Sequence, residues 1–172
     1  LALIGSLASG PWASAQSTAP ASLPTLTTIK SIRALSQDEG ARGYRVRVRG
    51  IVTHFDEQAN TGLIIHDGKL GQYVLSPATD APVPAWGDLR QGDLIELEGK
   101  TVRGGFAPNV VPSAVRRLGE SELPIPKRIP FASMLTGRHD CDFVEIDGVV
   151  LRTWQSPDPQ MRALFSDVAF EE

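Results

Sequence analysis

The sequence contains few of the residues on which several classes of protein depend. Its 172 residues include one cysteine, Cys141, which excludes an internal disulfide framework. The net charge of −3 and the aromatic content of 6% argue against a general nucleic-acid binder, because such proteins usually carry a basic excess and stacking aromatics. The patterns G-x-S-x-G, H-E-x-x-H and the P-loop are absent, and no carboxylate spacing singles out an acid and base pair. We therefore expect neither catalytic residues nor a cofactor.

The amino-terminal residues have the character of an export signal. The run LALIGSLASGPWASAQ is apolar and rich in small residues, and it contains Ala13-Ser14-Ala15. An apolar run followed by A-x-A is typical of a secretory signal peptide, so we interpret residues 1–15 as its remnant. An uncleaved signal anchor is the alternative, although the run is shorter than the ~20 apolar residues of a spanning helix. The signal predicts a periplasmic, extracytoplasmic location, and residues 16–26, rich in Ser, Thr, Ala and Pro, are expected to form a linker.

The next part of the chain changes from a short helical pattern to a strand pattern. A helical stretch, TIKSIRALS, precedes Ser36 and Glu39, which have the spacing of a capping box. Five short runs rich in β-branched and apolar residues follow, separated by Gly, Asp, Asn and Pro: YRVRVRGIVTHF, GLIIHD, QYVLS, DLIELEGKTV and PNVVPSAVRRLG. This spacing predicts an all-β fold with a small five-stranded barrel over residues 27–120. A different small barrel or a sandwich is the alternative.

Glycine interrupts the first of these runs. Arginine and valine alternate up to Arg49, so their side chains are expected on opposite faces of a strand. After Gly50 both Ile51 and Val52 are apolar, and a β-bulge or bend at the glycine would explain the break. A bent first strand and a late x-G-D-x-[IV]-x-[VL]-x-G strand, here residues 92–99, resemble the OB-fold. Gly50 is therefore assigned a structural role.

The chain after residue 130 repeats the beginning of the barrel. The segment DFVEIDGVVL aligns with YRVRVRGIVT, which places Gly148 on Gly50 at a separation of 98 residues. The stretch FASMLTG stands in the place of the helical stretch, and ALFSDV stands in the place of GLIIHD. We predict a Pro-rich linker at 121–130 and the start of a second OB-like barrel at 131–172, with Gly148 in the structural role of Gly50.

A longer pattern extends over most of the chain, from about residue 26 to residue 172. It runs IRALSQDEGARGYRVRVRGIVTHF, LIIHDGKLGQYV, LRQGDLIELEGKT, FAPNVV and LPIPKRIPFASMLTGRHDCDFVEIDGVVL. This pattern resembles the N-terminal extracytoplasmic region of bacterial membrane sensor histidine kinases, which belong to two-component systems. It is a diffuse barrel pattern, and neither a phospho-accepting His box nor an ATP-binding Gly-rich segment accompanies it.

The resemblance implies a function without catalysis. The chain would be the sensory or input module of a membrane signalling protein, with an unknown small ligand or a periplasmic protein as its partner. Its link to the membrane would be a transmembrane segment downstream of this sequence. The alternative is a secreted OB module that binds nucleic acid or oligosaccharide, alone or attached to a nuclease, and the net charge argues against the nucleic acid.

Three arginines on the first strand are the first candidate ligand site. Their guanidinium groups could hold a phosphate, a carboxylate or an acidic partner through charge-assisted bonds; they are Arg45, Arg47 and Arg49. Glu96 and Glu98 alternate in the same way on another strand, so cross-strand pairing or a solvated face is the alternative. The repeat has Glu145 and Asp147 at the positions of Arg47 and Arg49, which argues against an anion site shared by both barrels.

The surface on which OB-folds usually bind oligomers is the second candidate. It would include the loops DEQAN and RGGF and five side chains: His66, Lys69, Tyr73, Arg103 and Phe106. The alternative is that Tyr73 covers the core and Phe106 plugs the barrel end.

The segment RHDCD, residues 138–142, contains residue types that bind metals. A zinc site needs further ligands that return from a second segment, and His54 and His66 are lone residues in strand patterns. We therefore predict no metal site and interpret Cys141 as a small buried apolar residue.

Overall fold

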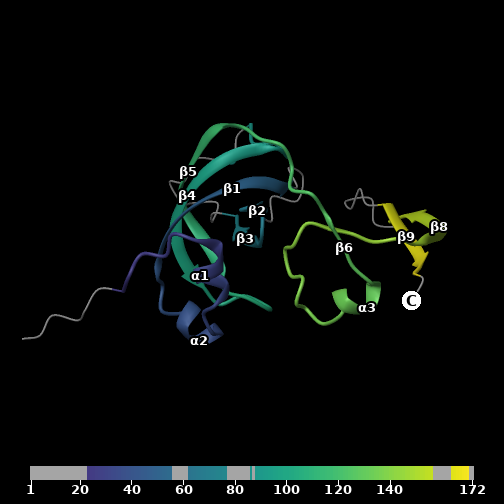
Figure 1. Ribbon diagram of the computed structural model, residues 1–172, viewed down its shortest axis with the longest axis horizontal. Helices are drawn as coiled ribbons and strands as arrows, with labels where there is room; N and C mark the ends of the chain where they lie inside the picture. Colours follow the sequence, from purple (N-terminus) through teal and green to yellow (C-terminus); the bar gives the residue numbers. More distant parts are fainter. Residues whose placement is uncertain (1–22, 56–61, 77–85, 87, 157–163, 171–172) are drawn as a thin grey trace, which may run out of the picture.

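The computed structural model describes residues 23–55, 62–76, 86, 88–156 and 164–170 (Figure 1). The predicted signal, most of the predicted linker 16–26 and the DEQAN loop therefore lie outside the described residues. No helix among the described residues is long and apolar enough to cross a membrane. The elements are, in chain order, α1 (Ile29–Arg33), α2 (Gln37–Gly40), β1 (Arg45–Phe55), β2 (Gly62–His66), β3 (Gly71–Leu75), β4 (Asp93–Val102), β5 (Asn109–Glu120), β6 (Lys127–Arg128), α3 (Phe131–Met134), β7 (Val144–Glu145), β8 (Val149–Gln155) and β9 (Leu164–Ala169).

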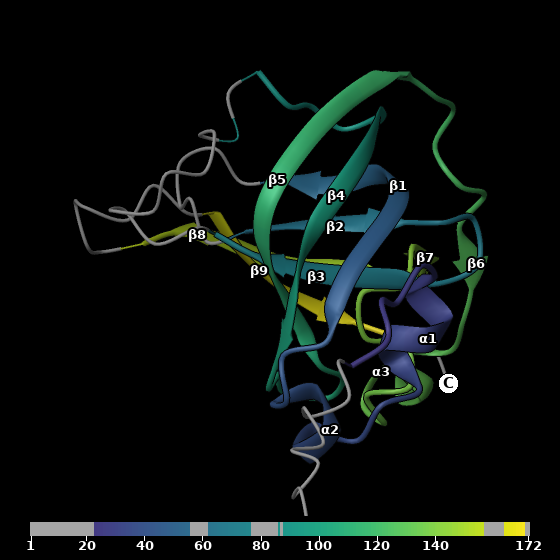
Figure 2. The ribbon, with the colours of Figure 1, turned by 90° about the vertical axis from the view of Figure 1, so that its left-hand side faces the viewer.

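Strands β1 to β5 form a closed barrel in the order β1-β2-β3-β5-β4 (Figure 2). All neighbours in the ring are antiparallel except β3 and β5, which meet in parallel at Val74 and Val110. Each of the five strand-like runs in the sequence forms one of these strands. The predicted all-β, OB-like barrel is therefore confirmed.

Alternating residues of the strands fill the barrel. On β1, Val46, Val48 and Val52 are at most 2% exposed, whereas the arginines between them face outward. The helix α1 adds Ile29 and Ile32, which lie three positions apart on one face and join the same core. Burying each such aliphatic side chain contributes about 1.5–3 kcal/mol. The core is therefore formed by the apolar residues that recur at every second position of β1 and three positions apart on α1.

Strand β1 serves two partners. It pairs with β4 from Arg45 to Ile51 and with β2 from Ile51 to Phe55. The register against β2 shifts between Val52 and His54, so the bulge lies after the predicted position at Gly50. Gly50 has another reason to be glycine, because a Cβ there would lie 3.0 Å from the Cβ of Ile65 on β2. The glycine lets β2 approach the bend of β1 closely.

Both predicted linkers contribute backbone pairing. The amide of Leu26 donates to Arg45, and the amide of Arg47 donates back to Leu26, which adds a short parallel bridge to β1. Within 121–130, β6 pairs in parallel with β7. Strands β8 and β9 form a separate antiparallel hairpin. The predicted capping box is confirmed, because Ser36 and Glu39 each bind the other's backbone amide.

The contact at Gly50 predicts that Gly50→Val destabilises the barrel by about 1–3 kcal/mol, the usual cost of overpacking. Valine forms strands better than glycine, so any loss of stability reports the contact with β2. Urea unfolding measures the change. Gly105→Val is the control, because a Cβ at Gly105 meets nothing within 4 Å. Equal stability of the two variants would contradict the explanation.

Candidate functional site

Glu96 on β4 binds arginines from both neighbouring strands. Arg49 Nε lies 3.0 Å from Glu96 Oε1, and Arg47 Nη2 lies 3.3 Å from Oε2. Arg116 on β5 approaches the same Oε2 at 2.8 Å. The register requires this meeting, because Arg49 and Arg116 are the residues directly opposite Glu96 on the two sides. Arg47 and Arg49 therefore make cross-strand ion pairs with Glu96.

The charge of this cluster is insensitive to pH near neutrality. Hydrogen bonds from Arg116, then from Arg49, lower the pKa of Glu96 to about 2, although its partial burial acts in the opposite direction. The Glu96 side chain is 8% exposed, whereas the three guanidinium-bearing side chains are 58–66% exposed. One shielded carboxylate thus holds three solvent-facing cations in fixed positions.

The outer face of β1, β4 and β5 carries more positive than negative charge. We call this surface the arginine face; it consists of Arg45, Arg47, Arg49, Glu96, Glu98, Lys100 and Arg116. Five cations and two anions leave an excess of three positive charges on a protein whose net charge is −3. Arg45 lies opposite Lys100 and not opposite a carboxylate. A hollow of about 390 Å³ borders the face, but Asp67 and Glu96 also line it.

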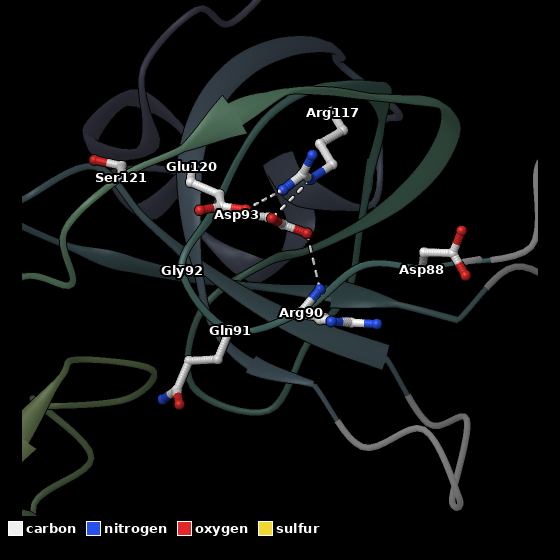
Figure 3. A pocket seen from close by; sticks show the side chains of 8 residues that line it. All are labelled: Asp88, Arg90, Gln91, Gly92, Asp93, Arg117, Glu120 and Ser121. Carbon is white, nitrogen blue, oxygen red and sulfur yellow. Dashed lines mark hydrogen bonds and ion pairs between the residues drawn. The ribbon is translucent and has the colours of Figure 1, made fainter.

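A larger hollow of about 660 Å³ lies where β4 begins and β5 ends (Figure 3). Asp93 is at its centre, with a side chain that is only 4% exposed. Its Oδ1 accepts from Arg117 Nε at 2.7 Å, and its Oδ2 accepts from the amide of Arg90 at 2.9 Å. Burial by itself raises the pKa of Asp93, but these hydrogen bonds outweigh it and hold the pKa below its ordinary value. Both carboxylate oxygens therefore have hydrogen-bond partners, and Asp93 links the backbone at Arg90 to the side chain of Arg117.

Part of the predicted OB ligand surface is in contact with a later segment of the chain. The segment 127–142 packs on the β2–β3 hairpin, where Lys127 Nζ donates to the carbonyl of Lys69 at 3.0 Å. Arg33 Nη1 bridges the two parts by donating to the carbonyls of Gly71 and Asp140. The approach is so close that a Cβ on Gly71 would lie 1.6 Å from the carbonyl oxygen of Cys141. We call this contact the hairpin junction.

The other predicted ligand residues divide among different contacts. Arg103 pairs with Asp38 on α2. Phe106 is 73% exposed, so the interpretation that it plugs the barrel end is wrong. A Cβ on Gly137 would lie 2.4 Å from the ring of Phe106, which places this ring against the segment after the barrel. Tyr73 is half-buried in the middle of β3. The predicted residues of this surface therefore do not form one common site.

His66 and Asp142 each have a buried polar atom without a hydrogen-bond partner among the described residues. His66 Nδ1 accepts the amide of Gly68 at 3.0 Å, so in the neutral ring the proton is on Nε2, which is the unpartnered atom. Burial lowers the pKa of His66, against the charges of Asp67 and Asp142 and together with those of Lys127 and Arg33. The junction thus holds a neutral histidine.

Asp142 is also the centre of a polar cluster in the predicted RHDCD segment. His139 Nδ1 lies 3.3 Å from Asp142 Oδ2, and its Nε2 lies 3.0 Å from Ser133 Oγ. The order of groups is that of a Ser-His-acid relay, and Asp142 also faces Lys127 Nζ at 3.7 Å.

Among the residues that the structure describes, no group of three or more His, Cys, Asp and Glu is placed to hold a metal ion. Burial, reinforced by the charge of Asp140, raises the pKa of Cys141 to about 12, so its thiol is protonated at neutral pH.

The chain was compared with family models, curated proteins and solved structures. No family model matches the chain, and no curated protein matches it. The hypothetical protein ygiW from E. coli is 14% identical with a TM-score of 0.38, and the match covers 56% of this chain and 90% of that one. Asparaginyl-tRNA synthetase from Entamoeba histolytica is 15% identical with a TM-score of 0.40, and the match covers 59% of this chain and 25% of that one. The assignment of the barrel depends on its own strand order.

The Glu96 cluster predicts that Glu96→Gln lowers the thermal midpoint more than Glu98→Gln does. The first change leaves three guanidinium groups without their shared carboxylate, whereas Glu98 is exposed and pairs with Arg47 at 3.5 Å. Circular dichroism during heating at low salt measures both variants. Equal midpoints would show that Glu96 does not organise the face.

The buried histidine predicts a loss of stability in mild acid. The unfolded chain binds a proton at His66 below a pH of about 6.5, while the folded state, with its lowered pKa, resists it. Stability therefore falls as the pH drops below about 6.5, by up to about 1.4 kcal/mol for each unit of difference between the two pKa values. Urea unfolding from pH 8 to pH 5 measures the slope. His66→Gln should flatten it, whereas His54→Gln, at an exposed position, should not.

Proposed function

We propose that this chain is a non-catalytic extracytoplasmic input module of a membrane signalling protein, of the kind that precedes a sensor histidine kinase. The observation that carries the proposal is the hairpin junction, in which the segment after the barrel packs on the surface where OB-folds usually bind ligands. A ligand or protein partner that binds there competes with the docked segment. Binding is thereby linked to the position of whatever follows the barrel.

The hairpin junction has few polar contacts, which favours competition between a ligand and the docked segment. Its polar contacts are a few hydrogen bonds through Arg33 and Lys127, each worth about 0.5–1.5 kcal/mol. The unpartnered His66 Nε2 and Asp142 Oδ1 weaken it further, because each buried polar atom without a partner costs about 1–3 kcal/mol. A modest difference in ligand affinity between the docked and undocked states is enough to shift their populations.

The arginine face is a second surface, apart from the hairpin junction, on which the module would bind a ligand or a partner. Arginine binds carboxylates and phosphates with two parallel hydrogen bonds, and Glu96 fixes the orientation of Arg47, Arg49 and Arg116 in advance. Preorganised donors lose little side-chain entropy on binding. The face therefore favours an anionic ligand or an acidic protein partner.

The proposal implies a longer protein of which this chain is one part, and we call it the parent protein. It is the protein in which the proposal is tested, in two steps. The reading frame should encode a transmembrane segment and a kinase core after this region. Lys127→Glu, which reverses the charge at the junction, should then change the basal autophosphorylation rate in membranes several-fold. Lys30→Glu is the matched control, because Lys30 is exposed on α1 and outside the junction. A frame without such segments, or equal rates for both variants, would reject the proposal.

The arginine face also favours a second candidate, a secreted OB module for nucleic acid or oligosaccharide. Binding of a single-stranded oligonucleotide through phosphate contacts would weaken steeply with salt, by about 0.7 in the logarithmic slope per contact. Fluorescence anisotropy with a labelled 12-mer and with a neutral oligosaccharide distinguishes the two. Steep salt dependence that Arg49→Ala reduces would favour this candidate over the input module.

A further inference from the structure

The β8–β9 hairpin repeats the geometry of the β1–β2 hairpin. In the first hairpin the register shifts between Val52 and His54, and in the second it shifts between Val150 and Arg152, 98 residues later in both cases. Val52 lies opposite Ile65, and Val150 lies opposite Val168. The predicted alignment of ALFSDV on GLIIHD is therefore off by two residues. A shift of two keeps each side chain on its face of the strand.

The glycines make the same approach in both hairpins. A Cβ on Gly50 would lie 3.0 Å from Ile65 Cβ, and one on Gly148 would lie 2.6 Å from Cγ1 of Val168, the equivalent of Ile65. The preceding segments agree as well. Leu26 donates to the carbonyl of Arg45, and Lys127 donates to that of Phe143, which again is 98 residues after Arg45. The predicted structural role of Gly148 matches this geometry.

Equivalent residues nevertheless differ in exposure. Val52 is 0% exposed inside the barrel, whereas Val150 is 57% exposed. Val149 and Leu151 beside it are 58% and 68% exposed, and Trp154 is 39% exposed. In the barrel β3, β5 and β4 close over the first hairpin, but β8 and β9 form a two-stranded sheet apart from the barrel strands (Figure 1). Isolated hairpins of two strands are marginally stable in water.

We propose that the β8–β9 hairpin is the docking surface for three further strands, equivalent to β3, β5 and β4, which the parent protein supplies after this hairpin and which close a second barrel. The repeated register identifies the occupant, because the same hairpin in the first barrel is covered by those three strands. The inference is independent of the proposed function.

The charges define the strand that would pair along β7 and β8. In the first barrel Arg47 and Arg49 lie opposite Glu98 and Glu96 on β4. The second copy has Glu145 and Asp147 at the positions of these arginines, of which Asp147 already pairs with Arg128. The incoming strand should therefore present a basic side chain opposite Glu145 and apolar side chains toward Val150.

The test compares this 172-residue chain with the parent protein extended beyond it. Trp154 is the reporter, and its signal is isolated by subtracting the spectrum of the Trp154→Phe variant. In the extended protein, iodide quenching of Trp154 should fall several-fold toward that of the buried Trp86, which is 5% exposed. Val150→Asp should lower the unfolding midpoint of the extended protein strongly and that of the short chain little. Val52→Asp, at the equivalent buried position, should destabilise both.

Three outcomes would overturn the inference. One is a parent frame without three further strands, and another is a Trp154 that remains as accessible in the extended protein as in the short chain. The third is a short chain that dimerises by sedimentation with Trp154 protected, since a second copy would then be the occupant. A protected Trp154 in a monomeric extended protein, together with sensitivity to Val150→Asp, supports it.

Discussion

The close approach of β1 and β2 at Gly50 is the constraint on which the rest of the structure depends. A small ring of strands closes only with local curvature, and β1 changes partner from β4 to β2 at Ile51. Because Gly50 has no side chain, Ile65 on β2 has room to pack against β1 at this position. The closed ring then sets β4 between β1 and β5, and Glu96 can meet arginines from both.

In the Glu96 cluster, closure of the barrel brings arginines from two neighbouring strands to one carboxylate. Exposed ion pairs between two side chains contribute little, typically about 0–1 kcal/mol. Here a shielded carboxylate has three cationic neighbours, and its pKa of about 2 keeps the arrangement constant through the physiological range. The result is a patch with an excess of basic side chains on a protein whose net charge is −3.

The hairpin junction, unlike the Glu96 cluster, has few polar interactions. In the part of the chain that the structure describes, its hydrogen bonds come from Arg33 and Lys127, and His66 Nε2 and Asp142 Oδ1 are buried without a partner. Burial is the main cause that lowers the pKa of His66. The surface that sequence patterns assign to a ligand is in this protein shared with the chain's own next segment.

The sequence by itself determined the features that depend on local patterns. Period-two alternation and turn residues located all five barrel strands, β4 to the residue, and the spacing of Ser36 and Glu39 located the cap of α2. It also indicated the repeat, because Gly50 and Gly148 stand in matching patterns. Only the tertiary structure decided which strands are neighbours, since alternation on β1 and β4 is the same whether or not they pair. For that reason the bulge after Val52, the third arginine on Glu96 and the docking of Lys127 on the β2–β3 hairpin could not be predicted: each depends on the register between segments that are distant in the sequence.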